Sequence, residues 1–360
     1  TAMEIQISRP PAVAGMFYPG DPRTLAAEVE TMIAHARAVL PAPNFGQPKA
    51  LIAPHAGYIY SGPIAASAYA CLIPYAQVIH RVVLLGPCHR VAVRGLAVPH
   101  AQSFGTPLGT IPLDQAAIAA ALELPQVVRH NGAHAEEHSL EVHLPFLQAT
   151  LEDFTLVPFA VGYASADEVA EVLELLWGGE ETLIVVSSDL SHYHPYAAAQ
   201  RLDGHTVDEI LHLHLLHDHE QACGATPING LIEVARRRGL VPHLLDLRNS
   251  GDTAGDKSHV VGYASFAFTE PRACSHSCDG GAGRESGDEA RRGIAAICRY
   301  SKEPQHRYAP DSPRPFGLQP EMASAALSGW PRGLPWASPP PCIHPFPASN
   351  AICRMSENRP

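Results

Sequence analysis

Four places where apolar runs end or a helix begins carry side chains that can bind metals or transfer protons. These side chains are His55, the pair Cys88 and His89, the group Asp189, His192 and His194, and Cys223. Two histidines with a thiolate or a carboxylate can hold a divalent metal and leave positions open for a substrate. Glycine or proline beside each group lets the backbone turn sharply or approach a ligand closely. Taken together, the groups indicate a metal or acid/base site.

Taken singly, each group has a simpler interpretation. A lone histidine after a strand is more often a hydrogen-bonded structural residue, and a cysteine near a helix start is more often a small buried apolar side chain. The segment HAEEHSLEVHLPF places His134 and His138 four residues apart, where a helix would present both on one face. The zinc motif H-E-x-x-H is absent. A polar helix start beside the site and a supporting role for this segment remain equally open. The tract LHLHLLHDHE is interpreted as a solvated helix end and loop.

The elements that must position these groups alternate between strand-like and helix-like runs. Strands are expected at 49–56, 81–87, 182–189 and 259–268, and helices at 63–75, 166–178 and 229–239. A hairpin-like excursion is expected within 95–114. This alternation predicts an α/β domain with a central sheet and helices on both faces. In such sheets functional groups collect where strands end, which is where the candidate side chains lie.

Composition divides the 360 residues into a body, 1–270, and a tail, 271–360. The body carries 14 Lys and Arg against 28 Asp and Glu, so it is a poor match for nucleic acid or anionic lipid. No apolar run approaches the ~20 residues that span a bilayer. Three cysteines in the body make no disulfide framework, which favours a reducing cytoplasm. The tail is rich in proline and glycine and is predicted to be disordered, although a read-through or frame-shifted end has the same composition.

Several common catalytic signatures are missing from the sequence. There is no G-x-x-x-x-G-K-[ST] phosphate loop and no G-x-G-x-x-G after a strand. The nucleophile elbow G-x-S-x-G is also absent. The sequence therefore does not favour nucleotide-driven chemistry or ordinary serine hydrolysis.

An ordered set of motifs in the body resembles the Memo family, whose bacterial members are named protein B of the AmmeMemoRadiSam system. The motifs are RPPAVAGMFYPGD, APHAGYIYSGPIAASAYA, LLGPCHR, EEHSLEVHLPFLQ, SSDLSHYHPY, ACGATPI and GDKSHVVGYASFAF. They cover roughly residues 8–270. The resemblance implies the fold of class III extradiol dioxygenases, a central mixed sheet flanked by helices. Those enzymes hold Fe(II) with two histidines and a glutamate and use a further histidine as acid/base.

The resemblance also implies roles for individual residues. His55 and His89 match the two ligand histidines, and Cys223 falls where the dioxygenases have the glutamate. His192 matches the acid/base position, with Asp189 beside it. Because a thiolate is a softer ligand than a carboxylate, iron or copper is expected as the metal, with zinc as a further candidate.

The function expected from this resemblance is redox chemistry related to that of dioxygenases, on an unknown small molecule or peptide. A non-catalytic metal-binding, ligand-binding or signalling module is the rival from another class, and a metal-dependent hydrolase is a third alternative. AMMECR-type and radical SAM proteins of the same system are the partners that the resemblance implies.

Overall fold

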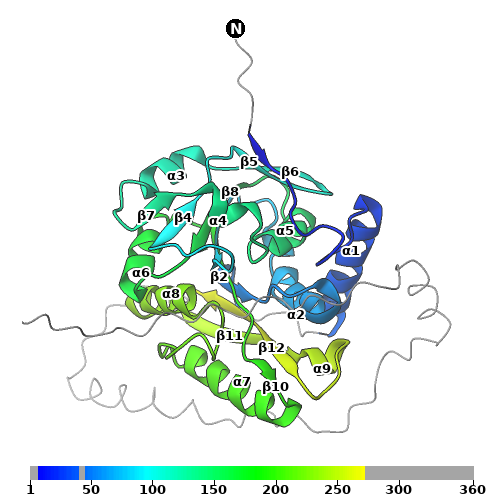
Figure 1. Cartoon of the computed structure of the whole chain (residues 1–360). Coiled ribbons are helices and arrows are strands. Elements are labelled where there is room, and N and C mark those ends of the chain that lie inside the picture. Colours follow the sequence, from blue (N-terminus) through cyan, green and yellow to red (C-terminus); the bar gives the residue numbers. More distant parts are fainter. Residues whose placement is uncertain (1–6, 40–44, 272–360) are drawn as a thin grey trace, which may run out of the picture. The chain divides into compact units, whose positions relative to one another are not determined.

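A nine-stranded mixed sheet forms the centre of the fold in the computed structural model, which describes residues 7–39 and 45–271 (Figure 1). Its strands are β2 (Pro48–Ala53), β3 (Arg81–Pro87), β4 (Leu96–Val98), β7 (Val127–Arg129), β8 (Thr155–Val161), β9 (Thr182–Ser187), β10 (His192–His194), β11 (Val241–Asn249) and β12 (Val260–Thr269). The strand order is β10-β12-β2-β9-β3-β8-β4-β7, and β11 pairs with β12. The disorder predicted for 271–360 concerns a segment that, apart from Pro271, lies outside the described residues.

The middle of the sheet consists of the parallel strands β2, β9, β3 and β8. Their residues are almost all buried, as expected for continuous apolar runs covered on both faces. Strand β12 then pairs antiparallel to β2, and β4 antiparallel to β8, so the sheet is mixed. The carboxyl ends of adjacent parallel strands meet at one edge of the sheet. The segments that follow β2, β9 and β3 therefore meet there as well.

A separate three-stranded sheet is formed by β1 (Ser8–Arg9), β5 (Ser103–Thr106) and β6 (Gly109–Pro112). Strands β5 and β6 make an antiparallel hairpin, with β1 parallel to β5. The hairpin expected within 95–114 is thus present, but only over its second half. The first half forms β4, which joins the central sheet instead.

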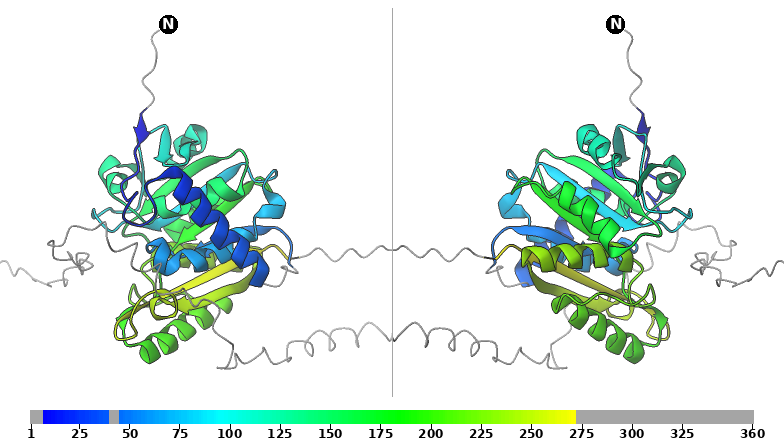
Figure 2. Two further views of the ribbon diagram at one scale, coloured as in Figure 1. Left: turned by 90° about the vertical axis from the view of Figure 1, so that its right-hand side faces the viewer. Right: turned by 90° about the vertical axis from the view of Figure 1, so that its left-hand side faces the viewer.

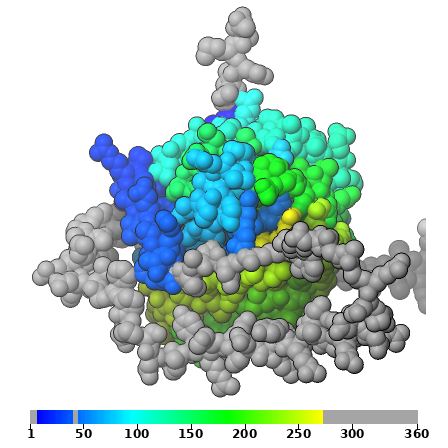
Figure 3. All heavy atoms as spheres, turned by 180° about the vertical axis from the view of Figure 1, so that it is seen from behind, coloured from blue at the N-terminus to red at the C-terminus, as the bar shows by residue number. Residues whose placement is uncertain are grey.

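Helices cover both faces of the central sheet, which confirms the predicted fold class. They are α1 (Pro22–Val39), α2 (Tyr58–Ala70), α3 (Gln115–Ala121), α4 (Asn131–Ala135), α5 (Leu144–Thr150), α6 (Ala166–Leu175), α7 (Tyr196–Leu211), α8 (Ala225–Arg238) and α9 (Ser250–Thr253), with 3-10 turns η1 (Ile73–Tyr75) and η2 (Glu141–His143). Helices α1, α2 and α5 pack together, with α2 against β2 and β12. Helices α6 and α8 pack together, with α8 against β3 and β9. Figure 2 shows the dark-blue α1 from one side and the green α6 from the other, and Figure 3 shows α1 at the molecular surface.

Two predicted helix starts were wrong. Helix α2 begins at Tyr58, five residues before Pro63, which lies inside the helix rather than in its first turn. Helix α8 begins at Ala225 rather than at 229, directly after Gly224. A glycine directly precedes the true start of each helix, Gly57 before α2 and Gly224 before α8. The sequence prediction placed the start of α2 at a proline and the start of α8 after its first turn. Both helices therefore begin closer to the candidate site residues His55 and Cys223 than the sequence suggested.

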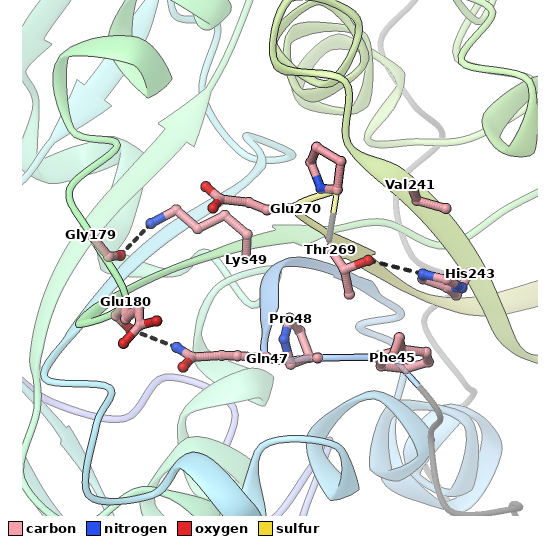
Figure 4. A pocket seen from close by; sticks show the side chains of 12 residues that line it. Phe45, Gln47, Pro48, Lys49, Gly179, Glu180, Val241, His243, Thr269 and Glu270 are labelled. Carbon is pink, nitrogen blue, oxygen red and sulfur yellow. Dashed lines mark hydrogen bonds between the residues drawn. The ribbon is translucent and has the colours of Figure 1, made fainter. Parts of the chain in front are cut away.

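A hollow of about 510 Å³ lies at the other end of the sheet, beside the starts of β2 and β9 (Figure 4). Its most prominent charged side chain, Lys49, already donates hydrogen bonds to the carbonyl oxygens of Trp177, Gly179 and Thr182. The hollow is separated from the carboxyl edge by the length of β2, roughly 20 Å for six residues. All three N–H groups of the Lys49 ammonium are bonded to protein carbonyls, so none remains to bind a ligand. The hollow is therefore not taken as the candidate site.

Candidate metal centre

Three of the predicted site residues follow three adjacent strands. His55 comes two residues after β2, Asp189 two residues after β9, and His89 two residues after β3. Because β2, β9 and β3 are neighbours in the parallel part of the sheet, these side chains meet at its carboxyl edge. This is the place where α/β sheets commonly bind ligands.

His55 is buried and held on two sides. Its Nδ1 lies 2.6 Å from Ser187 Oγ, and its backbone N–H donates to Asp189 Oδ1 at 2.8 Å. Ser187 Oγ uses its single hydrogen to donate to Ser139 O, so it must accept from a protonated Nδ1. Burial, together with nearby histidines, lowers the pKa of His55 well below its ordinary value. Nε2 is thus left with a free lone pair, as a metal ligand requires.

His89 is oriented by a buried carboxylate. Glu137 Oε1 lies 2.8 Å from His89 Nδ1, and Glu137 Oε2 accepts from the His89 backbone N–H at 2.5 Å. Burial opposes the charged form, but hydrogen bonds and negative charge at the Cys223 sulfur and the Glu137 carboxylate raise the pKa of His89 well above its ordinary value. A metal at His89 would therefore have to displace a proton.

His138 lies beside these two histidines. The sequence left the role of its segment undecided. One ligand nitrogen from each of His55, His89 and His138 lies within 4.8 Å of the others, and this is the only such group within residues 7–39 and 45–271. The rings of His89 and His138 stack at 4.7 Å. Burial lowers the pKa of His138 to about 4, so it is neutral at pH 7.

His134 and His138 do not share a helix face. Helix α4 ends at Ala135, so His138 lies in the turn that follows it. His134 is buried elsewhere, with its Nε2 2.9 Å from the carbonyl oxygen of Ala97. No local spacing could reveal His138, because its position depends on where this turn crosses the end of β3.

Cys223 reaches the same place from the start of α8. Its backbone N–H donates to the Asp189 carbonyl at 3.2 Å, and the Asp189 N–H lies 3.3 Å from Cys223 Sγ. A side chain at Gly224 would come within 2.5 Å of Ser187 O, so glycine is required for this approach. Cys223 Sγ lies 3.4 Å from His55 Nε2. The structure therefore brings together His55, His89 and Cys223, and their role as ligands stays a prediction.

Asp189 and His192 are placed differently from the pair that the sequence suggested. The carboxylate of Asp189 is bonded to the backbone of His55, and burial raises its pKa to about 7. Between residues 45 and 271 no hydrogen bond joins it to His192. His192 is half-buried in β10, close enough to affect the pKa of His55, and burial lowers its own pKa to about 4. It is thus neutral at pH 7 and can accept a proton. The acid/base role remains a prediction.

The strained backbone beside His192 is consistent with a functional loop. Tyr193 has φ of +60°, a conformation that non-glycine residues with bulky side chains rarely adopt. The following His194 is half-buried and pairs with Val260 of β12.

The donor atoms fit a transition metal. A tetrahedral centre with Zn–S of about 2.3 Å and Zn–N of about 2.05 Å puts a sulfur and a nitrogen ligand about 3.5 Å apart. The 3.4 Å between Cys223 Sγ and His55 Nε2 matches this spacing. Imidazole nitrogens and a thiolate suit iron, copper or zinc, and do not suit magnesium or calcium.

A family model described as "Memo-like protein" matches residues 9–267, which span β1 to β12 and include every candidate site residue. The chain belongs to the Memo-like protein family. Among its Memo-like relatives, a MEMO1 family protein of Sulfolobus acidocaldarius is 34% identical over 72% of this chain and 99% of that protein. A MEMO1 family protein of Aquifex aeolicus is 35% identical over 72% of this chain and 98% of its own length.

A solved structure of an uncharacterized protein from Escherichia coli K12 aligns with 60% of this Memo-like chain and 98% of its own. The TM-score is 0.43 and the identity 16%. None of the helices in the described parts of the chain is long and apolar enough to cross a membrane.

Proposed function

We propose that the chain is a metal-binding oxidoreductase, related in chemistry to dioxygenases, that acts on a small molecule or a peptide. The observation that supports this most directly is the convergence of three imidazoles within 4.8 Å, with a thiol 3.4 Å from one of them, where three parallel strands end. His55 and His89 would hold iron or copper, with zinc as a further candidate. Cys223 or His138 would supply the third donor.

The bound metal would supply a site for redox chemistry on the substrate. The other residues have separate tasks. Ser187 fixes the His55 tautomer, so that Nε2 is the nitrogen with a free lone pair. Asp189 holds the backbones of His55 and Cys223 in place. His192, neutral at pH 7, would accept a proton from the substrate.

One observation favours a second candidate function, a binding module without turnover. If His55, His89, His138 and Cys223 all bind one metal, four protein ligands close a tetrahedral site. Closed four-ligand sites are typical of structural or storage roles, whereas catalytic sites keep a position open. The number of protein ligands therefore separates the two functions.

Metal analysis and oxygen consumption test the proposal. The protein would be purified without oxygen, its metals measured by mass spectrometry, and dioxygen uptake followed on addition of a panel of catechols. Iron with substrate-dependent uptake supports the oxidoreductase. Copper without turnover supports the binding module, and zinc with ester or amide cleavage supports a hydrolase. A protein that takes up none of these metals would refute all three. AMMECR-type and radical SAM proteins remain proposed partners, testable by co-purification.

A further inference from the structure

Glu137 is a buried carboxylate whose contacts all lie around the candidate metal centre. Its side chain is 1% exposed and carries no arginine or lysine partner among the described residues. It accepts from the backbone N–H groups of His89, His138 and Ser139, and it contacts the ring of His89. One carboxylate thus joins the loop after β3 to the turn that carries His138.

We propose that Glu137 is a positioning residue of the proposed metal centre: it bonds His89 Nδ1 and the His89 backbone, so that His89 Nε2 is left as the metal-binding atom. This inference rests on the proposed metal binding. A carboxylate on the far nitrogen of a ligand histidine sets the ring orientation and its tautomer, and losing it commonly costs 10–100-fold in metal affinity.

The geometry supports a role in ligand orientation beyond the folding of a turn. The amides of His138 and Ser139 use only Oε1, each at 3.0 Å. The same oxygen reaches His89 Nδ1 at 2.8 Å, while Oε2 binds the His89 backbone. Two of the four hydrogen bonds of Glu137 therefore go to a histidine 48 residues away, whose ring stacks on that of His138. A carboxylate needed only for the turn would not require them.

Glu141 provides a structural comparison four residues away. It is also fully buried, and it accepts from Tyr18, from the amides of Ala12 and Val13, and from Arg9. None of these partners is a candidate ligand. Glu141 therefore anchors the N-terminal segment, and Glu141→Gln is the matched control for removing a buried carboxylate from this region.

The test uses zinc, which has no redox chemistry to confuse the measurement. Zinc affinity is measured by competition with a chromophoric chelator for the wild type, Glu137→Gln, Glu141→Gln, His89→Ala and the double variant of Glu137 and His89. We expect Glu137→Gln to lower zinc affinity 10–100-fold, and to lower it less than threefold in the His89→Ala background, because the carboxylate acts through His89. Folded Glu141→Gln should keep the wild-type affinity.

A second measurement needs no variant. Long-range ¹H–¹⁵N NMR of the zinc-loaded wild type should show zinc on His89 Nε2 and hydrogen on Nδ1. Zinc on Nδ1 would overturn the proposal. A Glu137→Gln affinity within twofold of wild type, or an equal loss in the His89→Ala background, would overturn it too. If the wild type binds no zinc, copper or iron at all, the metal-binding function itself fails, which is a distinct outcome.

Glu137→Asp covers the case in which Glu137→Gln does not fold. Aspartate withdraws the carboxylate by one bond length, yet aspartate side chains readily bond the backbone amide two residues on, here that of Ser139. The turn thus keeps an anchor while the His89 ring loses its partner. We expect the same 10–100-fold loss of zinc affinity, and an unchanged affinity would contradict the assignment.

Discussion

Replacing Cys223 or His138 tests which residue completes the proposed metal site, because both are candidates for its third ligand. Cys223→Ser keeps a hydroxyl that can accept from the Asp189 N–H, so the loop is expected to stay in place. His138→Ala removes the competing imidazole. Cys88→Ser, at a part-buried thiol bonded to the Val91 carbonyl, controls for the general effect of removing a cysteine.

The distances predict the larger loss for Cys223. Its sulfur is already 3.4 Å from His55 Nε2, against about 3.5 Å expected for two ligands of one tetrahedral metal. Nitrogen ligands of such a centre lie about 3.3 Å apart, whereas the three imidazole nitrogens are only within 4.8 Å of one another. The 4.8 Å limit leaves room for the imidazole set to contract by up to about 1.5 Å on binding, while one pair, His55 and Cys223, is already at coordination spacing.

The size of the effect follows from the energy of one ligand. Structural zinc sites with four ligands bind with about 10–16 kcal/mol, or roughly 2.5–4 kcal/mol for each ligand. One ligand is then worth roughly 10²–10³ in affinity. We expect Cys223→Ser to lose this amount for zinc, and more for copper(I), which prefers thiolate. His138→Ala should lose less than tenfold.

Chelator competition under argon, with zinc and with copper(I), measures these losses, and thermal unfolding of the metal-free variants confirms that each is folded. The reasoning is refuted if His138→Ala costs as much as Cys223→Ser, since the three imidazoles would then be the site. Equal small losses for both would mean that either residue can serve as the third donor. The spacing argument would fail in that case as well.

Three further predictions concern His192, which is proposed to transfer a proton, and two buried carboxylates. His192→Ala should keep its metal by mass spectrometry and, in an active enzyme, lower the rate about 10²–10⁴-fold; loss of metal equal to that of His55→Ala would make His192 a ligand. Glu141→Gln should lower the free energy of unfolding by about 3–5 kcal/mol in urea titrations, because it leaves the buried Arg9 unpaired; a change under 1 kcal/mol would contradict this. Asp203 has its pKa raised to about 6, mainly by burial, against 3.8 for the ordinary group, so the folded state binds its proton more tightly than the unfolded state. Its contribution to stability is therefore greatest below pH 3.8 and falls as the pH rises towards 6, by about 3 kcal/mol in all, and urea titrations from pH 4 to 7 should show this slope reduced in Asp203→Asn.

The sequence predicted the sheet and its carboxyl edge because both depend on local composition. Buried parallel strands are continuous apolar runs, and β3 was predicted at its observed bounds, with β2 and β9 within a few residues of theirs. His55 and His89 could therefore be placed at strand ends. Their partners could not, because Glu137 and His138 reach the edge through a turn held there by contacts with His89, which lies 48 residues before Glu137 in the sequence.

The proposed ligands differ in how firmly the fold holds them. His55 and His89 follow strands whose positions are fixed by hydrogen bonds to neighbouring strands, so their backbones cannot shift without disturbing the buried core. Cys223 and His138 lie instead on a helix start and a turn, and are held by a few contacts from Asp189 and Glu137. Changes in these two contacts would alter the third ligand, and with it the preferred metal, while the sheet stays intact. Glu137→Asp should therefore change metal selectivity, whereas the Cys223 contact is made by the Asp189 backbone N–H and should survive substitution of the Asp189 side chain.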